Sequence, residues 1–297
     1  MPASAKQRDP AELTFIDNGD SVLFGIPLTQ FAWLVATIVA GGAATGVLAG
    51  LFGVGGGAII VPVLYEVFRS LGVSDAVRMQ LCIGTSLAII LPTSIRSFLT
   101  HRAKGDLPVE ILRLWSVPII LGVAVGGGVA TVAPSVVFKL AFVVIAAFLA
   151  TKFLFANGAW QWGAELPGRS AMIAIGFVIG LYSSLIGVGG GALSNLVLTS
   201  YGRSMHVAVG VSAGVGILIS SAGAAGYAIA GLPHQAQVPP FSVGFVSLLG
   251  VALMAPVASL VAPYGARLAH ALSNRRLETA FALYLLAVAV RFLVSLF

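Results

Sequence analysis

One six-residue segment occurs twice in this sequence. Gly53–Ala58 reads GVGGGA, and the same six residues recur at Gly187–Ala192, in each case after a long apolar run. Four glycines in six residues disfavour an uninterrupted helix, because each glycine costs roughly 1 kcal/mol relative to alanine in a helix interior. Each copy therefore predicts a helix that stops and restarts. The restart leaves backbone N–H groups without helical partners, and such groups bind anions.

The apolar runs around these segments predict a membrane protein. Of the 297 residues, 58% are hydrophobic and only 9% are charged, and the mean hydropathy is +1.02. A soluble domain carries about 25% charged residues. Several runs reach the roughly 20 residues that a helix needs to cross the bilayer core. The short alternating segments typical of a transmembrane β-barrel are absent. We therefore predict an all-α integral membrane protein.

About ten apolar segments follow one another along the chain. We expect them at about Leu28–Phe52, Gly57–Arg69, Val77–Thr100, Leu107–Val132, Pro134–Ala156, Arg169–Ile186, Gly191–Tyr201, His206–Ala230, Pro240–Val261 and Leu277–Phe297. Residues 1–27 form a polar N-terminal arm, residues 28–156 a first transmembrane repeat, residues 157–168 a linker and residues 169–297 a second repeat. A surface stretch, Tyr264–Arg276, precedes the last segment.

The two repeats match beyond the glycine segment. Gly42 and Gly46 correspond to Gly176 and Gly180, and the other matched pairs are Gly84-Thr85-Ser86 with Gly210-Val211-Ser212, Gly122-Val123-Ala124 with Gly250-Val251-Ala252, and Lys152-Phe153-Leu154 with Arg291-Phe292-Leu293. Because these matches keep their order, they predict an internal duplication. Each repeat has five segments, an odd number, so the second enters the membrane from the opposite side. We therefore expect two inverted-topology repeats, each with a glycine-rich broken or re-entrant helix.

The loop charges predict the orientation in the membrane. Loops of one parity carry Arg102, Lys104, Arg113, Lys152, Arg169, Arg203, Arg267, Arg275 and Arg276, whereas the other parity has Lys6, Arg8, Arg69, Arg78 and Arg291. Basic residues concentrate on the cytoplasmic side of membrane proteins. We therefore expect a multi-pass protein of the bacterial cytoplasmic (inner) membrane with both termini on the periplasmic side.

Broken helices at corresponding places in inverted repeats indicate a substrate site near the membrane midplane. Helix rise puts Gly57 about 18 Å from Arg69, and Thr85 roughly 10–12 Å from Arg78, so both lie near mid-membrane. The residues that we expect to bind the substrate are Gly55, Gly56, Gly57, Thr85, Ser86, Gly189, Gly190, Gly191, Asn195 and Ser212. Neutral donors and helix N-termini suit a small oxyanion. Val211 stands where Thr85 does, so the second repeat offers one donor fewer.

Each of these residues also has a purely structural interpretation. The glycines would allow close helix packing, and Thr85, Ser86 and Ser212 would bond to carbonyls of their own helices. Arg96, Gln80 and His206 are candidates for a gating or charge role. Arg96 stands only five residues from His101, so its side chain would otherwise extend to the membrane surface.

Several other functions are disfavoured by the motifs. Gly53-x-Gly55-x-x-Ala58 loosely matches a dinucleotide-binding pattern, but it lies between apolar helices and does not follow a strand. Neither glycine segment has the Gly-Lys-Ser/Thr of a phosphate-binding loop, and no HExxH, Ser/His/Asp set or metal-ligand cluster appears. The absence of a basic run disfavours nucleic acid as a partner. We therefore expect no enzyme activity, no cofactor and no metal.

The paired segments GLFGVGGGAIIVPVL and SLIGVGGGALSNLVL, each followed by a helix with a Gly-(Thr/Val)-Ser element, resemble the TauE/SafE (TSUP) family of membrane anion transporters, the sulfite exporters. The resemblance covers Leu28–Phe297. It implies a ten-segment inverted-repeat carrier that moves sulfite, sulfonates or related organic acids. The family's glycine-rich segments map onto Gly53–Gly57 and Gly187–Gly191.

The sequence thus predicts a secondary transporter of small sulfur-containing anions that works by alternating access. A passive anion channel and a membrane subunit that docks an enzyme of sulfur metabolism are the alternatives. The expected partners are the anion, the lipid bilayer and a coupling ion, H⁺ or Na⁺. The carboxylates of Glu66, Asp75, Asp106, Glu110, Glu165 and Glu278 all stand near segment ends, which disfavours a carboxylate proton relay within the membrane.

Overall fold

The computed structural model describes residues 22–23, 26–52, 57–103, 108–155, 162–163, 165–270 and 274–296. Ten α-helices lie in these ranges: α1 (Leu28–Phe52), α2 (Gly57–Ser70), α3 (Asp75–Ala103), α4 (Val109–Val132), α5 (Ser135–Phe155), α6 (Arg169–Ile186), α7 (Gly191–Ser200), α8 (Met205–Gly231), α9 (Leu248–His270) and α10 (Asn274–Val294). A 3₁₀ helix, η2 (Leu232–Gln237), and an antiparallel hairpin, β3 (Ser242–Val243) and β4 (Val246–Ser247), join α8 to α9. A similar pair, β1 (Val22–Leu23) and β2 (Ile26–Pro27), precedes α1.

Seven helices in the described ranges are long and apolar enough to cross a membrane. Their apolar spans are Phe31–Leu48, Asp75–Ala103, Val109–Val132, Ser135–Lys152, Arg169–Ile186, Val207–Gln237 and Leu248–Gly265, and α10 holds a shorter apolar stretch, Thr279–Val294. The helices α2 and α7 are shorter still, with 14 and 10 residues. This set of apolar helices agrees with the predicted all-α membrane class.

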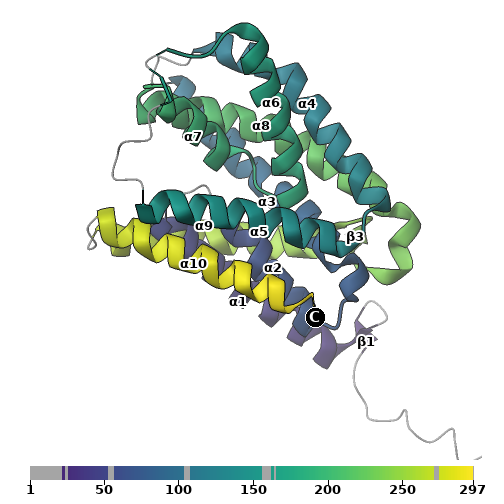
Figure 1. Cartoon of the computed structure of the whole chain (residues 1–297). Helices are drawn as coiled ribbons and strands as arrows, with labels where there is room; N and C mark the ends of the chain where they lie inside the picture. Colours follow the sequence, from purple (N-terminus) through teal and green to yellow (C-terminus); the bar gives the residue numbers. More distant parts are fainter. Residues whose placement is uncertain are drawn as a thin grey trace, which may run out of the picture.

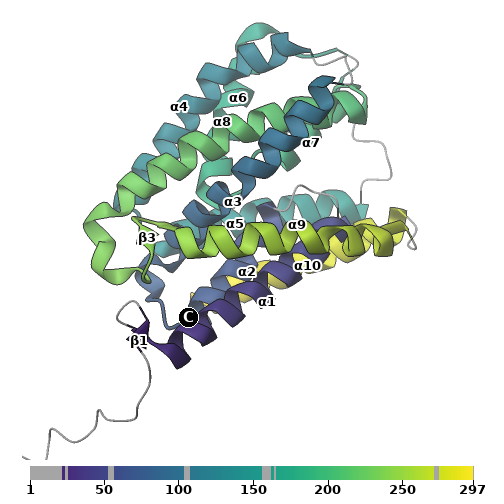
Figure 2. The ribbon, with the colours of Figure 1, turned by 180° about the vertical axis from the view of Figure 1, so that it is seen from behind.

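The helices form two groups, with α3 between them (Figure 1). One group contains α1, α2, α5, α9 and α10, and the other contains α4, α6, α7 and α8; the view from behind shows the same division (Figure 2). Within the groups α1 packs along α9, α4 along α6 and α5 along α10, while α3 and α8 pack against each other.

Glycines allow the two longest pairings. A Cβ atom on Gly46 of α1 would lie 2.5 Å from the carbonyl oxygen of Ala258 in α9, and one on Gly180 of α6 would contact the carbonyl oxygen of Ile119 in α4. Small residues at such points let two membrane helices approach backbone to backbone.

Two ends of the bundle can be named by their contacts. At the Asp75 end, Lys139 Nζ near the start of α5 bonds to Asp75 at the start of α3 and to the Ser295 carbonyl just after α10. At the Arg275 end, Arg275 Nη2 near the start of α10 donates to the Leu154 carbonyl near the end of α5 (2.7 Å). The start of α1 and the end of α10 lie together at the Asp75 end (Figure 1).

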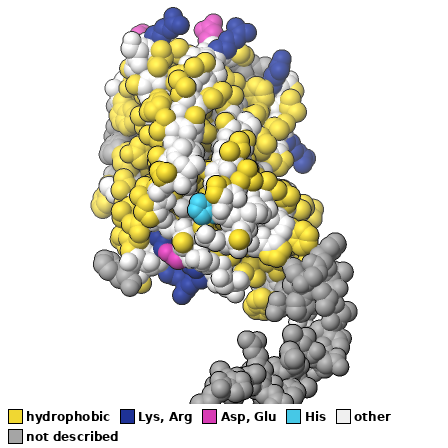
Figure 3. Space-filling view, turned by 90° about the vertical axis from the view of Figure 1, so that its right-hand side faces the viewer, with side chains coloured by type: hydrophobic (Ala, Val, Ile, Leu, Met, Phe, Trp, Pro, Cys, Tyr) yellow, Lys and Arg dark blue, Asp and Glu magenta, His cyan; other side chains and the backbone are white. Residues whose placement is uncertain are grey.

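The surface between these ends is apolar. On the face in Figure 3, hydrophobic side chains predominate, and the few charged side chains gather mainly toward the upper edge and near the lower part. Apolar side chains such as Val117, Leu121 and Val144 are more than half exposed. A continuous apolar exterior of this kind suits a lipid environment.

The predicted helices agree with the structure to within three residues at each end, except for the ninth. We expected that segment at Pro240–Val261, and the prediction was wrong, because the helix α9 runs from Leu248 to His270. The preceding residues form the β3–β4 hairpin, in which Phe241 and Gly244 have positive φ values of 60° and 52°. Two consecutive prolines before the hairpin lack N–H groups and disfavour a helix start there.

The other end of α9 was also misplaced. Helix α9 continues through Pro263 into the stretch that we expected to be a surface loop. Proline inside a membrane helix is tolerated, because neighbouring groups satisfy the backbone groups that it frees. Most of the predicted N-terminal arm and of the linker 157–168 lies outside the described residues.

Candidate functional site

The second glycine segment breaks a helix, as the sequence predicted. Helix α6 ends at Ile186, and both Gly187 (φ 70°) and Gly190 (φ 72°) adopt the left-handed conformation. The N–H groups of Gly187 and Val188 both donate to the Ser183 carbonyl, which closes the end of α6. Two left-handed residues within four positions require glycine at both, because a side chain is disfavoured there.

The helices α2 and α7 both begin in the interior of the bundle. Their lengths correspond to about 21 Å and about 15 Å, too short to cross a membrane. The start of α2 packs against the second break, since a Cβ atom on Gly57, the first residue of α2, would lie 2.9 Å from Cα of Val188. Ala58 of α2 and Ala192 of α7 line one small cavity beside this contact. The N-terminal ends of two short helices therefore converge at one place.

The glycines of the two segments have different surroundings. Gly55 and Gly56 lie outside the described residues. Gly189 and Gly190 lie against Ile90 and Ile219, which a Cβ atom on either glycine would displace. Gly191, by contrast, has open space where its Cβ would stand. The second break is thus tightly packed up to the first residue of α7.

Ser86 reaches the break and Thr85 does not. The Ser86 hydroxyl donates to the Gly187 carbonyl (2.8 Å), and both groups are buried. The Thr85 hydroxyl instead accepts the backbone N–H of Ser247 (3.0 Å), at the junction of β4 and α9. Successive residues of a helix face different neighbours, so one of the two predicted donors holds the break and the other holds the hairpin.

Asn195 and Ser212 are hydrogen-bonded to each other, and Ser194 joins them. Ser212 Oγ donates to Asn195 Oδ1 (2.5 Å) and lies 2.7 Å from Ser194 Oγ. Ser194 Oγ also donates to the Gly190 carbonyl (2.6 Å), so this cluster ties Asn195 and Ser212 to the start of α7. The amide nitrogen of Asn195 keeps two N–H groups, for which the described residues provide no acceptor.

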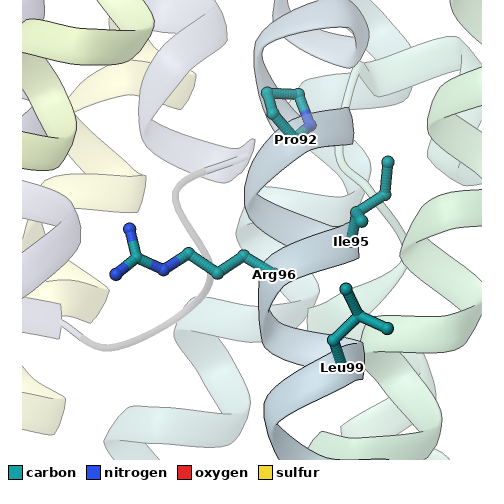
Figure 4. Close-up of a pocket in the computed structure, with 4 residues that line it drawn as sticks. All are labelled: Pro92, Ile95, Arg96 and Leu99. Carbon is teal, nitrogen blue, oxygen red and sulfur yellow. The ribbon is translucent and has the colours of Figure 1, made fainter.

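The three residues expected to have a gating or charge role lie elsewhere. Gln80 bonds to the Ala133 carbonyl (3.2 Å) and accepts from Ser135 (3.3 Å), so it joins α3 to the corner between α4 and α5. Arg96 borders an open groove of about 530 Å³ together with Pro92, Ile95 and Leu99. Its guanidinium extends away from Ile95 and Leu99 (Figure 4). His206 belongs to the first turn of α8, and its side chain is outside the described set.

The field at the break favours negative charge. The start of α7 carries the partial positive charge of a helix N-terminus, and no described side chain caps it. Ser86, Ser194, Asn195 and Ser212, which lie at or next to the break, are all neutral. Among the residues that the structure describes, no group of three or more His, Cys, Asp or Glu side chains could hold a metal ion. The donors left for a ligand among these groups are the first N–H groups of α7 and the amide N–H groups of Asn195.

Sequence reasoning missed Ser194, although a signal was present. Ser194 and Asn195 are polar, whereas the matching positions of the first repeat are Ile60 and Val61. Comparing the two copies beyond their shared glycines would have drawn attention to both polar residues. The pair makes the second break more polar than the start of α2.

Sequence reasoning also missed Lys139. Its side chain is 1% exposed, and Nζ lies 3.0 and 2.9 Å from the two carboxylate oxygens of Asp75. Asp75 also accepts from the Tyr65 hydroxyl (3.0 Å) and from Arg78 (3.3 Å). This ion-pair network joins α2, α3, α5 and the chain just after α10 at one end of the bundle. The partner of Lys139 is far away in sequence, which is why the sequence alone did not indicate it.

Comparison with known proteins finds membrane transporters among the relatives of this chain. A probable membrane transporter protein of Haemophilus influenzae is 30% identical over 249 residues, which are 84% of this chain and 94% of the relative. One of Methanocaldococcus jannaschii is 26% identical over 241 residues, 76% of this chain and 83% of the relative. No solved structure matches the chain.

The family comparison covers most of the sequence. The model of the family "Sulfite exporter TauE/SafE" matches residues 38–292, which include both glycine segments and all of α2 to α9. The protein is a multi-pass membrane transporter and not an enzyme. The chain belongs to the sulfite exporter TauE/SafE family.

Proposed function

We propose that this protein is a secondary transporter of small sulfur-containing anions, that is sulfite, sulfonates or related organic acids. It works by alternating access and holds the substrate near the membrane midplane at the two glycine-rich breaks. One observation carries the proposal: α2 begins at Gly57 against Val188 of the second break, and the first turns of α2 and α7 line one small cavity through Ala58 and Ala192. Two positive helix ends that converge inside an apolar bundle form an anion site without a basic side chain.

The donors at the second break support an oxyanion as the substrate. The first N–H groups of α7 have no helical acceptors, and the amide nitrogen of Asn195 adds two further donors. Each oxygen of a sulfite or sulfonate group accepts more than one hydrogen bond, so several donors are used at once. Hydrogen bonds to a charged oxygen are roughly twice as strong as those between neutral groups.

The helix pairing supports two inverted repeats. Under the matches found in the sequence, α1 corresponds to α6 and α9 to α4, and the structure pairs α1 with α9 and α6 with α4. Gly46 on α1 and Gly180 on α6, which correspond in sequence, occupy corresponding places in these two contacts. Inverted repeats are the common basis of alternating access in secondary transporters.

The packing supports a carrier over a channel. The cavity beside the breaks is lined only by apolar side chains from α2, α5, α6, α7, α10 and the break itself, and its volume is about 10 Å³. A space of this size holds at most about one water molecule. A channel needs a continuous water path, whereas an occluded centre is expected of a carrier.

Charge distribution supports the proposed orientation in the inner membrane, with the termini in the periplasm. Among the described residues, the helix ends at the Arg275 end carry Arg102, Arg113, Lys152, Arg169, Arg203, Arg275 and Arg276, and those at the Asp75 end carry Arg69, Arg78, Lys139 and Arg291. The richer end is expected to face the cytoplasm. The proposal includes a coupling ion, H⁺ or Na⁺.

Anion binding by the purified protein tests the proposal. A ligand at 100 times its Kd stabilises a folded protein by roughly 2.7 kcal/mol, so a panel of sulfite, sulfate, methanesulfonate, acetate and phosphate should raise the Tm selectively. Gly57→Leu should abolish the shift because its side chain would collide with Val188 where α2 begins against the second break. Gly128→Leu is the matched control, since a Cβ there meets open space.

Transport assays separate the carrier from the channel. In proteoliposomes, a carrier shows saturable uptake of radiolabelled sulfite that is accelerated by unlabelled sulfite on the far side. Absence of any anion-dependent Tm shift and of any uptake would contradict the proposed function. Uptake without saturation or trans-acceleration would support the channel.

A further inference from the structure

The hydroxyl group of Ser220, in the middle of α8, is buried and has no partner among the described residues. The side chain is 0% exposed, and Oγ makes no hydrogen bond there. Serine and threonine in helices usually donate to a carbonyl of their own helix, as Ser221 does to Ile217 and Thr93 does to Ile90. A buried polar group without a partner is costly and indicates a missing ligand or water.

This hydroxyl lies at the second glycine break. Ser220 Oγ is 3.5 Å from the position that a Cβ on Gly189 would occupy. Gly189 precedes Gly190, the N-cap residue of α7, so the hydroxyl stands near the positive end of that helix, which no described side chain caps. Two independent features, an unpaired buried donor and unpaired helix N–H groups, therefore coincide.

A second serine occupies the equivalent place in the first repeat. The register that pairs Ser86 with Ser212 also pairs Ser94 of α3 with Ser220 of α8. A Cβ on Gly216 of α8 would lie 2.6 Å from Ser94 Oγ and 3.2 Å from the carbonyl oxygen of Gly189. Both hydroxyls thus stand where α3 and α8 cross, next to the break.

We propose that Ser220, assisted by Ser94, donates a hydrogen bond to an oxygen of the substrate anion at the start of α7. This inference rests on the proposed function and deepens it, because it places the oxyanion on the α8 side of the second break. The hydroxyl proton of Ser220 supplies one donor and the N–H groups of α7 supply the others. A substrate with at least two acceptor oxygens is needed to use both sets.

The test compares Ser220→Ala with Ser221→Ala, its neighbour on the exposed side of α8. Sulfite and methanesulfonate binding are measured by Tm shift and by isothermal titration. Loss of a hydrogen bond to a charged group should raise the Kd by about tenfold or more in Ser220→Ala. The Tm of ligand-free Ser220→Ala should stay level or rise, because an unpaired buried hydroxyl is removed. Ser221→Ala should change the Kd of neither ligand.

The two measurements separate a binding role from a structural one. A substrate-contacting serine weakens binding without lowering ligand-free stability, and Ser94→Ala should weaken binding as well. If Ser220→Ala binds both anions as tightly as the unaltered protein, or only lowers the ligand-free Tm, the inference is overturned while the proposed function stands. If the unaltered protein binds neither anion, the proposed function fails and this inference fails with it.

Discussion

Replacing Asp75 by asparagine should destabilise the protein more than replacing Lys139 by methionine. The ammonium of Lys139 is buried, and its three N–H groups are directed to the two Asp75 oxygens and the Ser295 carbonyl. Asp75→Asn removes the counter-charge and leaves that ammonium buried. Removing one member of a buried ion pair costs about 3–5 kcal/mol, and because Asp75 is 53% exposed we expect the lower end, about 3 kcal/mol.

Substitution of the other member of the pair, Lys139, leaves a carboxylate that still has partners. In Lys139→Met, Asp75 keeps the Tyr65 hydroxyl, Arg78 and the positive end of α3, and it remains half exposed. Methionine fills a similar volume and carries no charge to desolvate. The expected cost is therefore about 1 kcal/mol.

The double variant completes the cycle. Asp75→Asn with Lys139→Met should be less destabilised than Asp75→Asn alone, because no buried charge is left without a partner. Free energies of unfolding are measured by far-UV circular dichroism in mixed micelles with increasing sodium dodecyl sulfate. Strictly additive costs, or a greater loss from Lys139→Met than from Asp75→Asn, would refute the account of this pair.

Two further substitutions test the geometry of the second break. Gly190→Ala should lower the free energy of unfolding by at least about 1–2 kcal/mol, because the residue has φ 72° and its new methyl would collide with Ile219. Gly191→Ala places its methyl in open space and should stabilise α7 by up to about 1 kcal/mol. Equal Tm values for the two variants would contradict this geometry. Ser86→Ala leaves the buried Gly187 carbonyl without its donor and should lower the free energy of unfolding by about 1–3 kcal/mol. The exposed control Ser116→Ala should change it by no more than about 0.5 kcal/mol in the same unfolding assay.

Much of the helical architecture could be read from the sequence, because its signals are local. Apolar runs that end at the two glycine segments define α1 and α6 to the residue, and the segment at Gly187–Ala192 places the break between α6 and α7. The ninth helix was misplaced for an equally local reason. The apolar residues Phe241, Val243 and Val246 read as the start of a helix, yet they form a hairpin that packs against α8.

The candidate site was predicted less completely. Helical spacing placed Thr85 and Ser86 at the same depth, but their directions differ by about 100°. Only the packing of α3 against the break and the hairpin decides that Ser86 bonds to Gly187 while Thr85 bonds to Ser247. Ser220 was overlooked because a serine in an apolar helix is ordinarily satisfied by its own backbone.

The sequence by itself determined the membrane class, the order of the helices and the position of the second break. These three features follow from the length of the apolar runs and from the backbone conformations that glycine can adopt. Both are local properties of the chain, so they do not depend on how the helices pack. Tertiary structure alone decided that α2 begins against the second break, that Lys139 pairs with Asp75, and that Ser220 faces Gly189 without a partner among the described residues. Each of these joins distant parts of the chain, so it depends on how the helices pack and not on any local propensity.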